Sequence, residues 1–369
     1  MLYKESDLVR IAKRENNAKR SYLVVNRKQG KHIAVSPGEA LAMFHALAEL
    51  LEEPCRGERL LVVGFAETAT AIGACVAADL QAAYIQTTRE AIAGAEYLYF
   101  SESHSHAVEQ RLVRGDLAGA MERVDRIVFV EDEVTTGNTI WSAIESIEAV
   151  WGRKVRFSVA SLLNGMDVAA QERYQARGIA LHYLVKTDHG AYAALAQKYT
   201  GQGIYEKPQV QGCPEALRVL EPSGYLDTRR LQQGEQYRHA CEEMSRQVLS
   251  ALAPQSHKRY LVMGTEEFMY PGLILAQQME AMGCLVRFHA TTRSPIAVSP
   301  EPEYPLHVRY ELCSLYETGR RTFVYDPGAC EEAVIVCDAP EITKAGLSSL
   351  TCVLARAGAE QITLVRWHG

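Results

Sequence analysis

Short runs of apolar residues alternate along this chain with longer stretches in which apolar residues recur every three or four positions. The short runs are typical of strands, and the longer stretches are typical of amphipathic helices. Their alternation predicts an α/β protein with a mostly parallel sheet flanked by helices. The predicted strands are 21–26, 59–64, 82–87, 126–130, 155–163, 179–185, 259–263, 284–290, 322–325, 333–337 and 362–367. The predicted helices are one that starts at Ser36-Pro37-Gly38-Glu39, then 69–80, 138–151, 231–252 and 271–282.

The periodicity weakens between Thr200 and about Ser256, where glycine, proline and polar residues are frequent. Such a stretch is typical of a linker. A chain of 369 residues is also long enough to bury two cores. We therefore predict a first domain at 1–205, a linker and helix at 206–255, and a second α/β domain at 256–369.

The two halves of the chain resemble each other. Leu61-Val-Val-Gly-Phe-Ala-Glu-Thr68 has a counterpart in Leu261-Val-Met-Gly-Thr-Glu-Glu-Phe268, and each is followed by a helix and a strand that ends in Thr-Thr-Arg. A later strand in each half ends in an acid, Asp132 or Asp338. This pattern predicts two units of related topology, the second of which has lost part of the first unit's site. Chance similarity between two strand–helix units is the alternative.

The composition of the chain argues against several classes of protein. The net charge of −6 argues against a general nucleic-acid-binding protein. The first ten residues contain no apolar signal-peptide core, and no apolar run reaches the length of a membrane span. The nine cysteines are scattered, which fits reduced thiols better than a disulfide framework. We therefore expect a cytoplasmic protein that contacts neither nucleic acid nor membrane.

The segment from Arg126 to Ile140 carries the most specific chemistry. An apolar strand runs into acids, then into threonines and a glycine, and then into a helix. Ligands of parallel sheets bind at the carboxyl ends of strands, and a helix start favours an anion. The acids would repel a phosphate in the same cradle, so they are expected to face hydroxyl groups or Mg²⁺ beside it. A ribose 5-phosphate with a metal-bound leaving group satisfies all these features.

This segment resembles the phosphoribosyl-pyrophosphate (PRPP) motif of type I phosphoribosyltransferases, including those that act on orotate. The resemblance implies that Glu131 and Asp132 hold the ribose hydroxyls and the metal, and act in catalysis. Glu133 departs from the apolar residue that usually follows the acid pair. The cradle of the 5-phosphate would consist of Thr135, Thr136, Gly137, Asn138 and Thr139.

Flanking segments extend the resemblance. The pyrophosphate loop of the family would correspond to Gly64, Phe65, Ala66, Glu67 and Thr68. Arg89 follows the next strand and would neutralise the pyrophosphate, although an ordinary surface arginine is the alternative. The polar stretch 96–106 would be a lid whose His104 and His106 act on the base or pyrophosphate; solvated loop histidines are the alternative. A hood over the acceptor or a phosphate would use Lys19, Arg20, Lys31 and His32, with solvated charges as the alternative.

Thr292-Arg293-Ser294-Pro295 resembles the signature of the TRSP domain, which follows a phosphoribosyltransferase domain in proteins of bacterial tellurite-resistance gene clusters. The order of the two motifs matches that two-domain family. The resemblance implies a role in making a nucleoside-like metabolite. Arg293 and Ser294 would bind a second ligand, unless the second domain only packs or dimerises. A second PRPP site is not expected, because Cys337-Asp338 replaces the acid pair.

We therefore expect an enzyme that transfers a phosphoribosyl group between PRPP and a nucleobase-like acceptor with Mg²⁺. Thr135 stands where some purine-specific relatives carry an acidic base, so an orotate-like site is the more natural one. The resemblance also implies a homodimer. Two alternatives are a non-catalytic sensor of PRPP or a nucleotide, and a hydrolase or lyase that acts on a ribosyl phosphate.

Overall fold

The computed structural model describes residues 2–15, 20–100, 110–152, 155–208 and 217–369. These residues form two compact units. The first consists of Met1–Tyr3, Leu41–Thr187 and Leu226–Ala240, and the second of Lys4–Ala40, Asp188–Tyr225 and Cys241–Gly369. Among the described residues, no helix is both long and apolar enough to cross a membrane.

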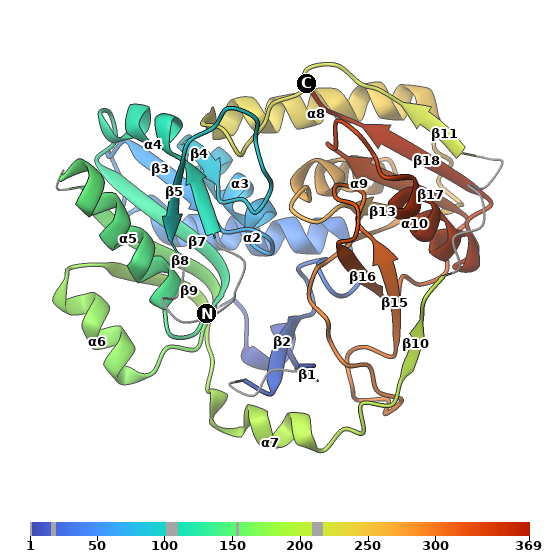
Figure 1. Cartoon of the computed structure of the whole chain (residues 1–369), viewed down its shortest axis with the longest axis horizontal. Coiled ribbons are helices and arrows are strands. Elements are labelled where there is room, and N and C mark those ends of the chain that lie inside the picture. Colours follow the sequence, from blue (N-terminus) through green and yellow to red (C-terminus); the bar gives the residue numbers. More distant parts are fainter. Residues whose placement is uncertain (1, 16–19, 101–109, 153–154, 209–216) are drawn as a thin grey trace. The chain divides into compact units, whose positions relative to one another are not determined.

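The first unit is built on a six-stranded sheet with the order β12-β4-β3-β7-β8-β9 (Figure 1). Its strands are parallel except for the short edge strand β12. A two-stranded hairpin of β5 and β6 completes the unit. Its strands are β3 (Leu60–Gly64), β4 (Ala83–Gln86), β5 (Tyr97–Phe100), β6 (Gln110–Val113), β7 (Arg126–Val134), β8 (Arg156–Asn164), β9 (Ala180–Lys186) and β12 (Gln232–Gln233). Its helices are α3 (Thr70–Asp79), α4 (Arg114–Met121), α5 (Asn138–Trp151) and α6 (Val168–Ala176), with most of α2 (Pro37–Glu52) and the start of α8 (Gly234–Leu252).

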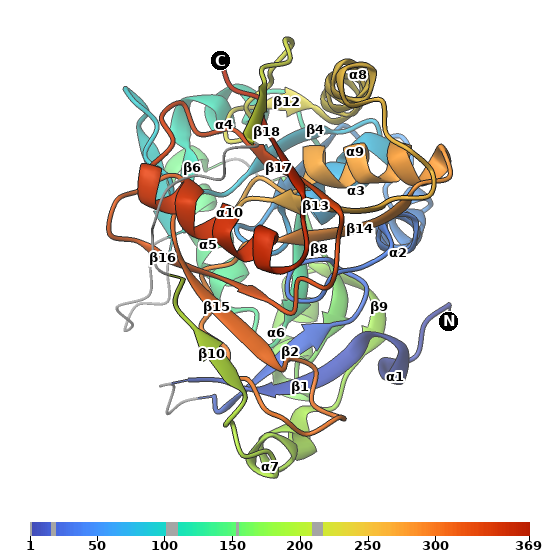
Figure 2. The ribbon, with the colours of Figure 1, turned by 90° about the vertical axis from the view of Figure 1, so that its right-hand side faces the viewer.

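The second unit is built on a five-stranded parallel sheet with the order β11-β18-β17-β13-β14. Figure 2 shows α9 and α10 on opposite faces of this sheet. The strands of the second unit are β1 (Val9–Lys13), β2 (Tyr22–Asn26), β10 (Ile204–Glu206), β11 (Leu217–Leu220), β13 (Arg259–Gly264), β14 (Leu285–Ala290), β15 (Val308–Cys313), β16 (Arg321–Tyr325), β17 (Glu332–Cys337) and β18 (Gln361–Arg366). Its helices are α1 (Glu5–Leu8), η1 (His189–Ala191), α7 (Tyr192–Gln197), α9 (Tyr270–Ala281) and α10 (Lys344–Arg356).

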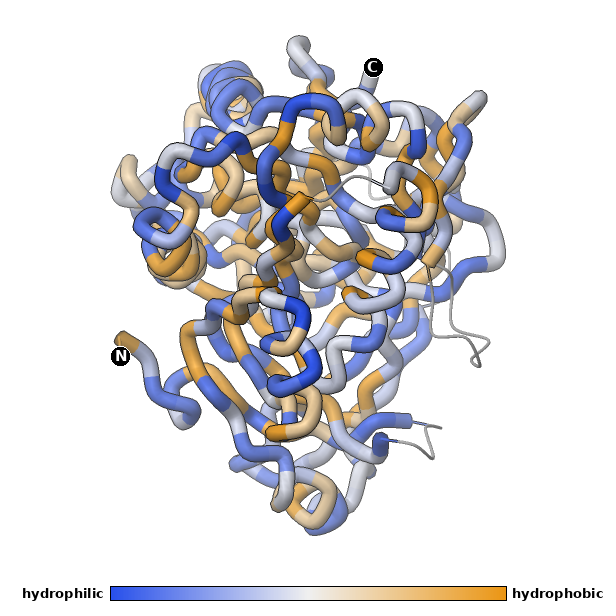
Figure 3. Tube along the Cα trace, turned by 90° about the vertical axis from the view of Figure 1, so that its left-hand side faces the viewer, coloured by the Kyte–Doolittle hydropathy of each residue, from blue (hydrophilic) through white to orange (hydrophobic). Residues whose placement is uncertain are grey.

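Burial follows the hydrophobic pattern of the sequence. The first five residues of β7 are buried, because helices cover both faces of a central parallel strand. Helix α5 buries Ile140, Ile144 and Ile147 on one face, at helical spacing. Figure 3 shows the resulting alternation of hydrophobic and hydrophilic residues along the trace. The predicted α/β class, with a parallel sheet in each half, is therefore confirmed.

The predicted repeat is also present in the two sheets. The central strands β3 and β13 each lie between two parallel neighbours, and Gly64 pairs with Val130 as Gly264 pairs with Val336. The amide of Thr87 donates to the oxygen of Gly64, at 2.9 Å, and that of Thr291 to Gly264, at 3.1 Å. Because backbone contacts match as well as element order, related topology explains the similarity better than chance.

The segment between 200 and 256 differs from a plain linker. β10 and β11 join sheets of the second unit, and β12 joins the sheet of the first unit. These strands have two to four residues, which is too short for a period of two to stand out in the sequence. The compact units consequently divide the chain differently from 1–205, 206–255 and 256–369.

The two units differ in how closely the helix after the central strand packs on that strand, and substitution of one glycine in each helix tests this difference. A methyl group on Gly73 would lie 2.8 Å from the Cα of Gly64, whereas one on Gly272 would lie 3.6 Å from the Cα of Gly264. We expect Gly73→Ala to lower the free energy of unfolding by about 1–3 kcal/mol, because backbone cannot move aside as a side chain can.

Gly272→Ala is the matched control. Its closest neighbour is the ring of Phe288 at 3.2 Å, and alanine also improves helix propensity by about 1 kcal/mol. We expect a change near zero. Urea unfolding of both variants measures the difference, and equal losses of stability would contradict this account of the packing.

Candidate active site

Two loops of the first unit meet at the carboxyl edge of its sheet. β3 and β7 are adjacent and parallel, so the segments that follow Gly64 and Val130 leave the sheet side by side. The hydroxyl of Thr68 donates to Oδ1 of Asp132 over 2.8 Å. The structure therefore joins the predicted pyrophosphate loop directly to the predicted acid pair, although 64 positions separate them in the sequence.

The segment from Thr135 to Thr139 forms a turn that ends at the start of α5. Gly137 has φ of 71°, in the left-handed region that favours glycine. A methyl group there would lie 2.6 Å from Cε of Met166 and 2.7 Å from the hydroxyl of Tyr174. That hydroxyl donates to the Gly137 oxygen at 2.6 Å, which fixes the turn. The first amides of the 14-residue helix α5 then provide an electropositive cradle that fits an anion.

Arg173 of α6 adds a positive charge to this turn that the sequence did not indicate. Its Nη2 donates to the Thr136 oxygen at 3.1 Å and to Oδ1 of Asn138 at 3.0 Å. Its guanidinium also lies over the ring of Trp141, at 4.5 Å. No motif surrounds Arg173 in the sequence, and only the packing of α6 brings it to the turn.

The acid pair lies at the end of β7, where both carboxylates are partly buried. Desolvation raises the pKa of Glu131 well above its ordinary value, and the charges of Asp132 and Glu133 act in the same direction. Arg89 lowers it, so its charge acts on this carboxylate. A site in which burial disfavours the ionised form of Glu131 fits a divalent cation or hydroxyl donors beside the two acids, because either would stabilise that form.

The loop after β3 is held by the neighbouring strand and the hairpin. The Ala66 amide donates to Oγ1 of Thr87 at 2.8 Å, and Nε2 of Gln110 donates to the Ala66 oxygen at 2.5 Å. Oγ1 of Thr87 donates in turn to Oε1 of Gln110 at 2.7 Å. The peptide bond between Ala66 and Glu67 is cis. Gln110 therefore positions this loop, a role that sequence reasoning missed because it depends on how β6 folds back.

Arg89 lies directly beyond β4, as predicted. The Thr88 amide donates to the Arg111 oxygen at 3.0 Å, and Nη2 of Arg111 donates to the Arg89 oxygen at 3.1 Å. The predicted lid begins with β5 of the hairpin. His104 and His106 lie outside the described residues, so their roles stay predictions.

Three of the four predicted hood residues lie within the described part of the chain. Lys19 lies outside the described residues, and Arg20, Lys31 and His32 belong to the second unit. The guanidinium of Arg20 lies over the ring of Tyr22, at 4.5 Å. Lys31 is fully buried, and its Nζ donates to the oxygens of Glu266 and Thr291 at 2.8 and 2.9 Å. His32 is also buried. The acceptor or phosphate contacts of these residues stay predictions.

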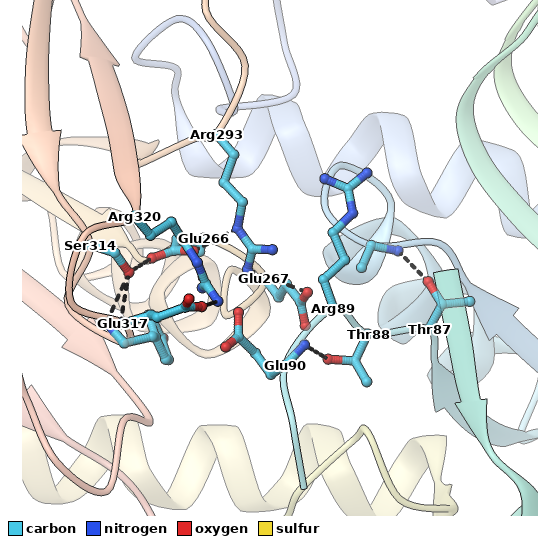
Figure 4. Close-up of polar contacts among 12 residues, drawn as sticks. Thr87, Thr88, Arg89, Glu90, Glu266, Glu267, Arg293, Ser314, Glu317 and Arg320 are labelled. Carbon is cyan, nitrogen blue, oxygen red and sulfur yellow. Dashed lines mark hydrogen bonds and ion pairs between the residues drawn. The ribbon is translucent and has the colours of Figure 1, made fainter. Parts of the chain in front are cut away.

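The second unit carries a different set of charges at the equivalent strand ends (Figure 4). Nε of Arg293 lies 2.6 Å from Oε2 of Glu266, and Nη1 of Arg320 lies 2.9 Å from the same oxygen. Ser314 donates to the other oxygen of Glu266 at 2.5 Å. The Ser294 amide donates to Oγ1 of Thr292 at 3.2 Å. Arg293 and Arg320 thus compensate the charge of Glu266. Binding of a second ligand by Arg293 and Ser294 stays a prediction.

The acid that corresponds to Asp132 also has different neighbours. Oδ1 of Asp338 accepts from the hydroxyl of Tyr316 at 2.8 Å, and Oδ2 accepts from the hydroxyl of Tyr225 at 3.2 Å. Phe268 stands where the first unit has Thr68. Both oxygens of the Asp338 carboxylate thus accept hydrogen bonds from tyrosine hydroxyls. In a PRPP site, the carboxylate at this position would instead face ribose hydroxyls or a metal ion.

Comparison with known families supports the predicted two-part organisation. The sequence profile of a family described as "Phosphoribosyl transferase" matches residues 8–194. A second profile, described as "TRSP domain C terminus to PRTase_2", matches residues 228–354. No curated protein matches the chain.

Solved structures similar to this chain include phosphoribosyltransferases of low sequence identity. Adenine phosphoribosyltransferase from Rhodothermus marinus is 17% identical, with 49% of this chain and 96% of that chain covered and a TM-score of 0.35. Orotate phosphoribosyltransferase from Aeropyrum pernix is 18% identical, with 49% and 89% covered and a TM-score of 0.32. Adenine phosphoribosyltransferase from Trypanosoma brucei, in complex with AMP, pyrophosphate and ribose-5-phosphate, is 15% identical, with 39% of this chain and 64% of that chain covered and a TM-score of 0.30.

The raised pKa of Glu131 predicts how the free protein responds to pH. Between the ordinary glutamate pKa of about 4.3 and the raised value, the folded state holds a proton that the unfolded state releases. Stability therefore falls as pH rises through this window. We expect Glu131→Gln to match the wild type near pH 4 and to become progressively more stable than it as pH rises above the ordinary glutamate pKa, in thermal unfolding without ligand.

Glu58 provides a control in which the pH dependence of stability has the opposite sign. Its hydrogen bond with Arg126, which lies 2.8 Å away, lowers its pKa, so its contribution to stability is present at neutral pH and lost as pH falls. Glu58→Gln should therefore be less stable than wild type at pH 7, with a difference that shrinks towards pH 3. The same pH trend in both variants would contradict the assignment.

Proposed function

Because the chain belongs to the phosphoribosyl transferase family, whose profile covers residues 8–194, we propose that its first unit binds PRPP with Mg²⁺. It then transfers the phosphoribosyl group to or from a nucleobase-like acceptor. The observation that carries this proposal is the hydrogen bond from Thr68 to Asp132. This bond joins the loop that we propose binds pyrophosphate to the acid pair at the end of β7, which supports a shared site.

Each part of the site then has one task. The amides of Thr136–Thr139 donate to the 5-phosphate, and Arg173 supports that turn with its positive charge. Glu131 and Asp132 accept hydrogen bonds from the ribose hydroxyls and would also hold the metal. Mg²⁺, when bound, supplies positive charge to the pyrophosphate oxygens.

The transfer itself breaks the bond between C1 of ribose and a pyrophosphate oxygen and forms a bond between C1 and an acceptor nitrogen, which gives up its proton to solvent. Pyrophosphate leaves with the bonding electrons, so negative charge grows on the leaving group. Arg89 and the amides of Glu67 and Thr68 would stabilise that charge, since the amides of Phe65 and Ala66 donate to Val130 and Thr87 within the protein. The chain needs no covalent nucleophile, and catalysis consists of positioning and electrostatic stabilisation.

We propose the class of acceptor from the residue type at position 135. Thr135 replaces the acid that would serve as a base towards a purine, so an orotate-like acceptor fits better. We also propose that the protein acts in the cytoplasm as a homodimer and that its product is a nucleoside-like metabolite of a tellurite-resistance gene cluster. If PRPP binds but no base releases pyrophosphate, the protein is instead a sensor; release of free ribose 5-phosphate would indicate a hydrolase.

A thermal shift with PRPP and Mg²⁺ tests the proposed site. A ligand at about a hundred times its dissociation constant stabilises a protein by about 2.7 kcal/mol. We expect this shift in the wild type and its loss in Asp132→Asn. Each midpoint is compared with that of the same variant without ligand, so that any change in intrinsic stability cancels.

Asp338→Asn is the matched control, because Asp338 holds the equivalent place in the second unit. It should keep the full shift even if its own stability is lower. Loss of the shift in Asp338→Asn with retention in Asp132→Asn would move the PRPP site to the second unit. No shift in the wild type would overturn the proposal.

The role of Arg173 is tested by Arg173→Gln. Loss of a hydrogen bond from a charged group costs about 1.5–3 kcal/mol, so we expect the dissociation constant of PRPP to rise about ten- to a hundredfold, measured by calorimetry. Arg177 is the control, since it also lies over Trp141, at 4.8 Å, but pairs with Glu148 instead of the turn. Arg177→Gln should change the affinity less than threefold, and similar losses in both variants would contradict a specific role for Arg173.

A further inference from the structure

A second group of reactive side chains lies at the far end of α3 from the pyrophosphate loop. His45 of α2 and Cys75 and Asp79 of α3 bring Nδ1, Sγ and a carboxylate oxygen within 4.8 Å of one another. Helix α3 starts at Thr70, directly after the loop, and ends at Asp79. With a rise of about 1.5 Å per residue, Asp79 is roughly 13 Å along the helix from its start. The group is therefore separate from the proposed PRPP site.

The distances within the group suit a tetrahedral metal ion. Bonds of about 2.0–2.3 Å to nitrogen, oxygen and sulfur place tetrahedral ligand atoms about 3.3–3.6 Å apart. Sγ of Cys75 lies 3.5 Å from Nδ1 of His45 and 3.9 Å from Oδ2 of Asp79. Nδ1 and Oδ2 are 2.5 Å apart, because they share a hydrogen bond. An ion that replaces that bond requires these two atoms to separate by about 1 Å, a small movement for a side chain as exposed as His45.

A cavity of about 380 Å³ gives access to the group. Its lining includes His45, Asp79 and two further carboxylates, Glu49 and Glu52, together with one cation, Arg238. Three carboxylates and one guanidinium leave an excess of negative charge that attracts a cation. Nη1 of Arg238 lies 3.5 Å from Oδ1 of Asp79, so it faces the oxygen that is not shared with His45. The oxygen needed for an ion stays directed at the histidine.

The chemistry of the donors selects the kind of ion. One nitrogen, one sulfur and one carboxylate oxygen are the ligands of Zn²⁺ and similar transition-metal ions, whereas Mg²⁺ prefers oxygen alone. Glu49 lies one helical turn from His45 on the same helix and lines the same cavity. It or a water molecule can take the fourth position. The Cys75 thiol must lose its proton when it becomes a ligand, as in other thiolate sites.

We propose that His45, Cys75 and Asp79 form a binding site for a zinc-like transition-metal ion that joins α2 to α3, independently of the PRPP site. The site differs from the proposed Mg²⁺ site in its donors, in its place in the first unit and in its expected ion. An ion bound there stabilises the folded state, because the unfolded chain does not hold the three donors together.

Cobalt substitution tests the proposal on the full-length chain without an affinity tag. Co²⁺ bound to a thiolate gives a near-ultraviolet charge-transfer band, which reports the sulfur ligand directly. We expect one Co²⁺ per chain, a band that saturates with it, and displacement by Zn²⁺. Cys75→Ser should abolish the band. Cys55→Ser is the control, because Cys55 is another buried cysteine of the same unit and lies outside the group.

His45→Gln and Asp79→Asn keep the proposal testable if Cys75→Ser does not fold. Both side chains lie at the cavity, and loss of either ligand should weaken Co²⁺ binding by tenfold or more, since even indirect partners of a metal change its affinity by about 10–100-fold. Absence of the band in the wild type, or its persistence in Cys75→Ser, would overturn the proposal. PRPP binding is measured on the same variants, and it should not change.

Discussion

The candidate site depends on the alignment of two parallel strands, β3 and β7, whose carboxyl ends reach the same edge of the sheet. The alignment allows Thr68 to donate to Asp132, so that a loop and an acid from distant parts of the sequence share one site. Close packing makes the alignment possible: Gly73 of α3 rests against the backbone of Gly64, and any side chain there would push helix and loop away from the strand. The hydrogen bond between Thr68 and Asp132 therefore depends on the close packing of Gly73 against Gly64.

The same scaffold occurs twice and supports two different polar networks. In both units the amide after the first loop residue donates to a threonine at the end of the neighbouring strand, at 2.8 Å to Thr87 and at 3.0 Å to Thr291. The two units thus share this contact between a loop amide and a threonine hydroxyl, whereas their charged side chains differ. The first unit has two adjacent acids, Glu131 and Asp132, and burial raises the pKa of Glu131. The second pairs Glu266 with two arginines, so its charges are compensated within the protein. The two networks therefore differ in their charged groups although the sheet scaffold beneath them is similar.

Most of the secondary structure and the central motif follow from local patterns in the sequence. Helix α5 occupies the predicted residues, because a glycine in the left-handed region starts it and an apolar stripe defines its buried face. Long-range contacts were not predictable in this way. Arg173 and Gln110 reach the site only because α6 and β6 fold back onto it, and no local pattern marks either residue. Strands such as β11, with four residues, owe their existence to pairing with a neighbour rather than to their own periodicity.

Long-range contacts also explain why each compact unit combines segments that are not consecutive in the sequence. The family profile covers residues 8–194, yet Lys4–Ala40 belongs to the second unit. There, Val35 pairs with Phe288 and the ammonium of Lys31 is buried against two carbonyl oxygens. Burial of an ammonium group is costly unless such acceptors compensate it, so this segment requires residues around 266 and 291 for its own stability. Leu226–Ala240, beyond the first profile, in turn contributes β12 to the sheet of the first unit. Each unit is therefore assembled from segments that lie far apart in the sequence.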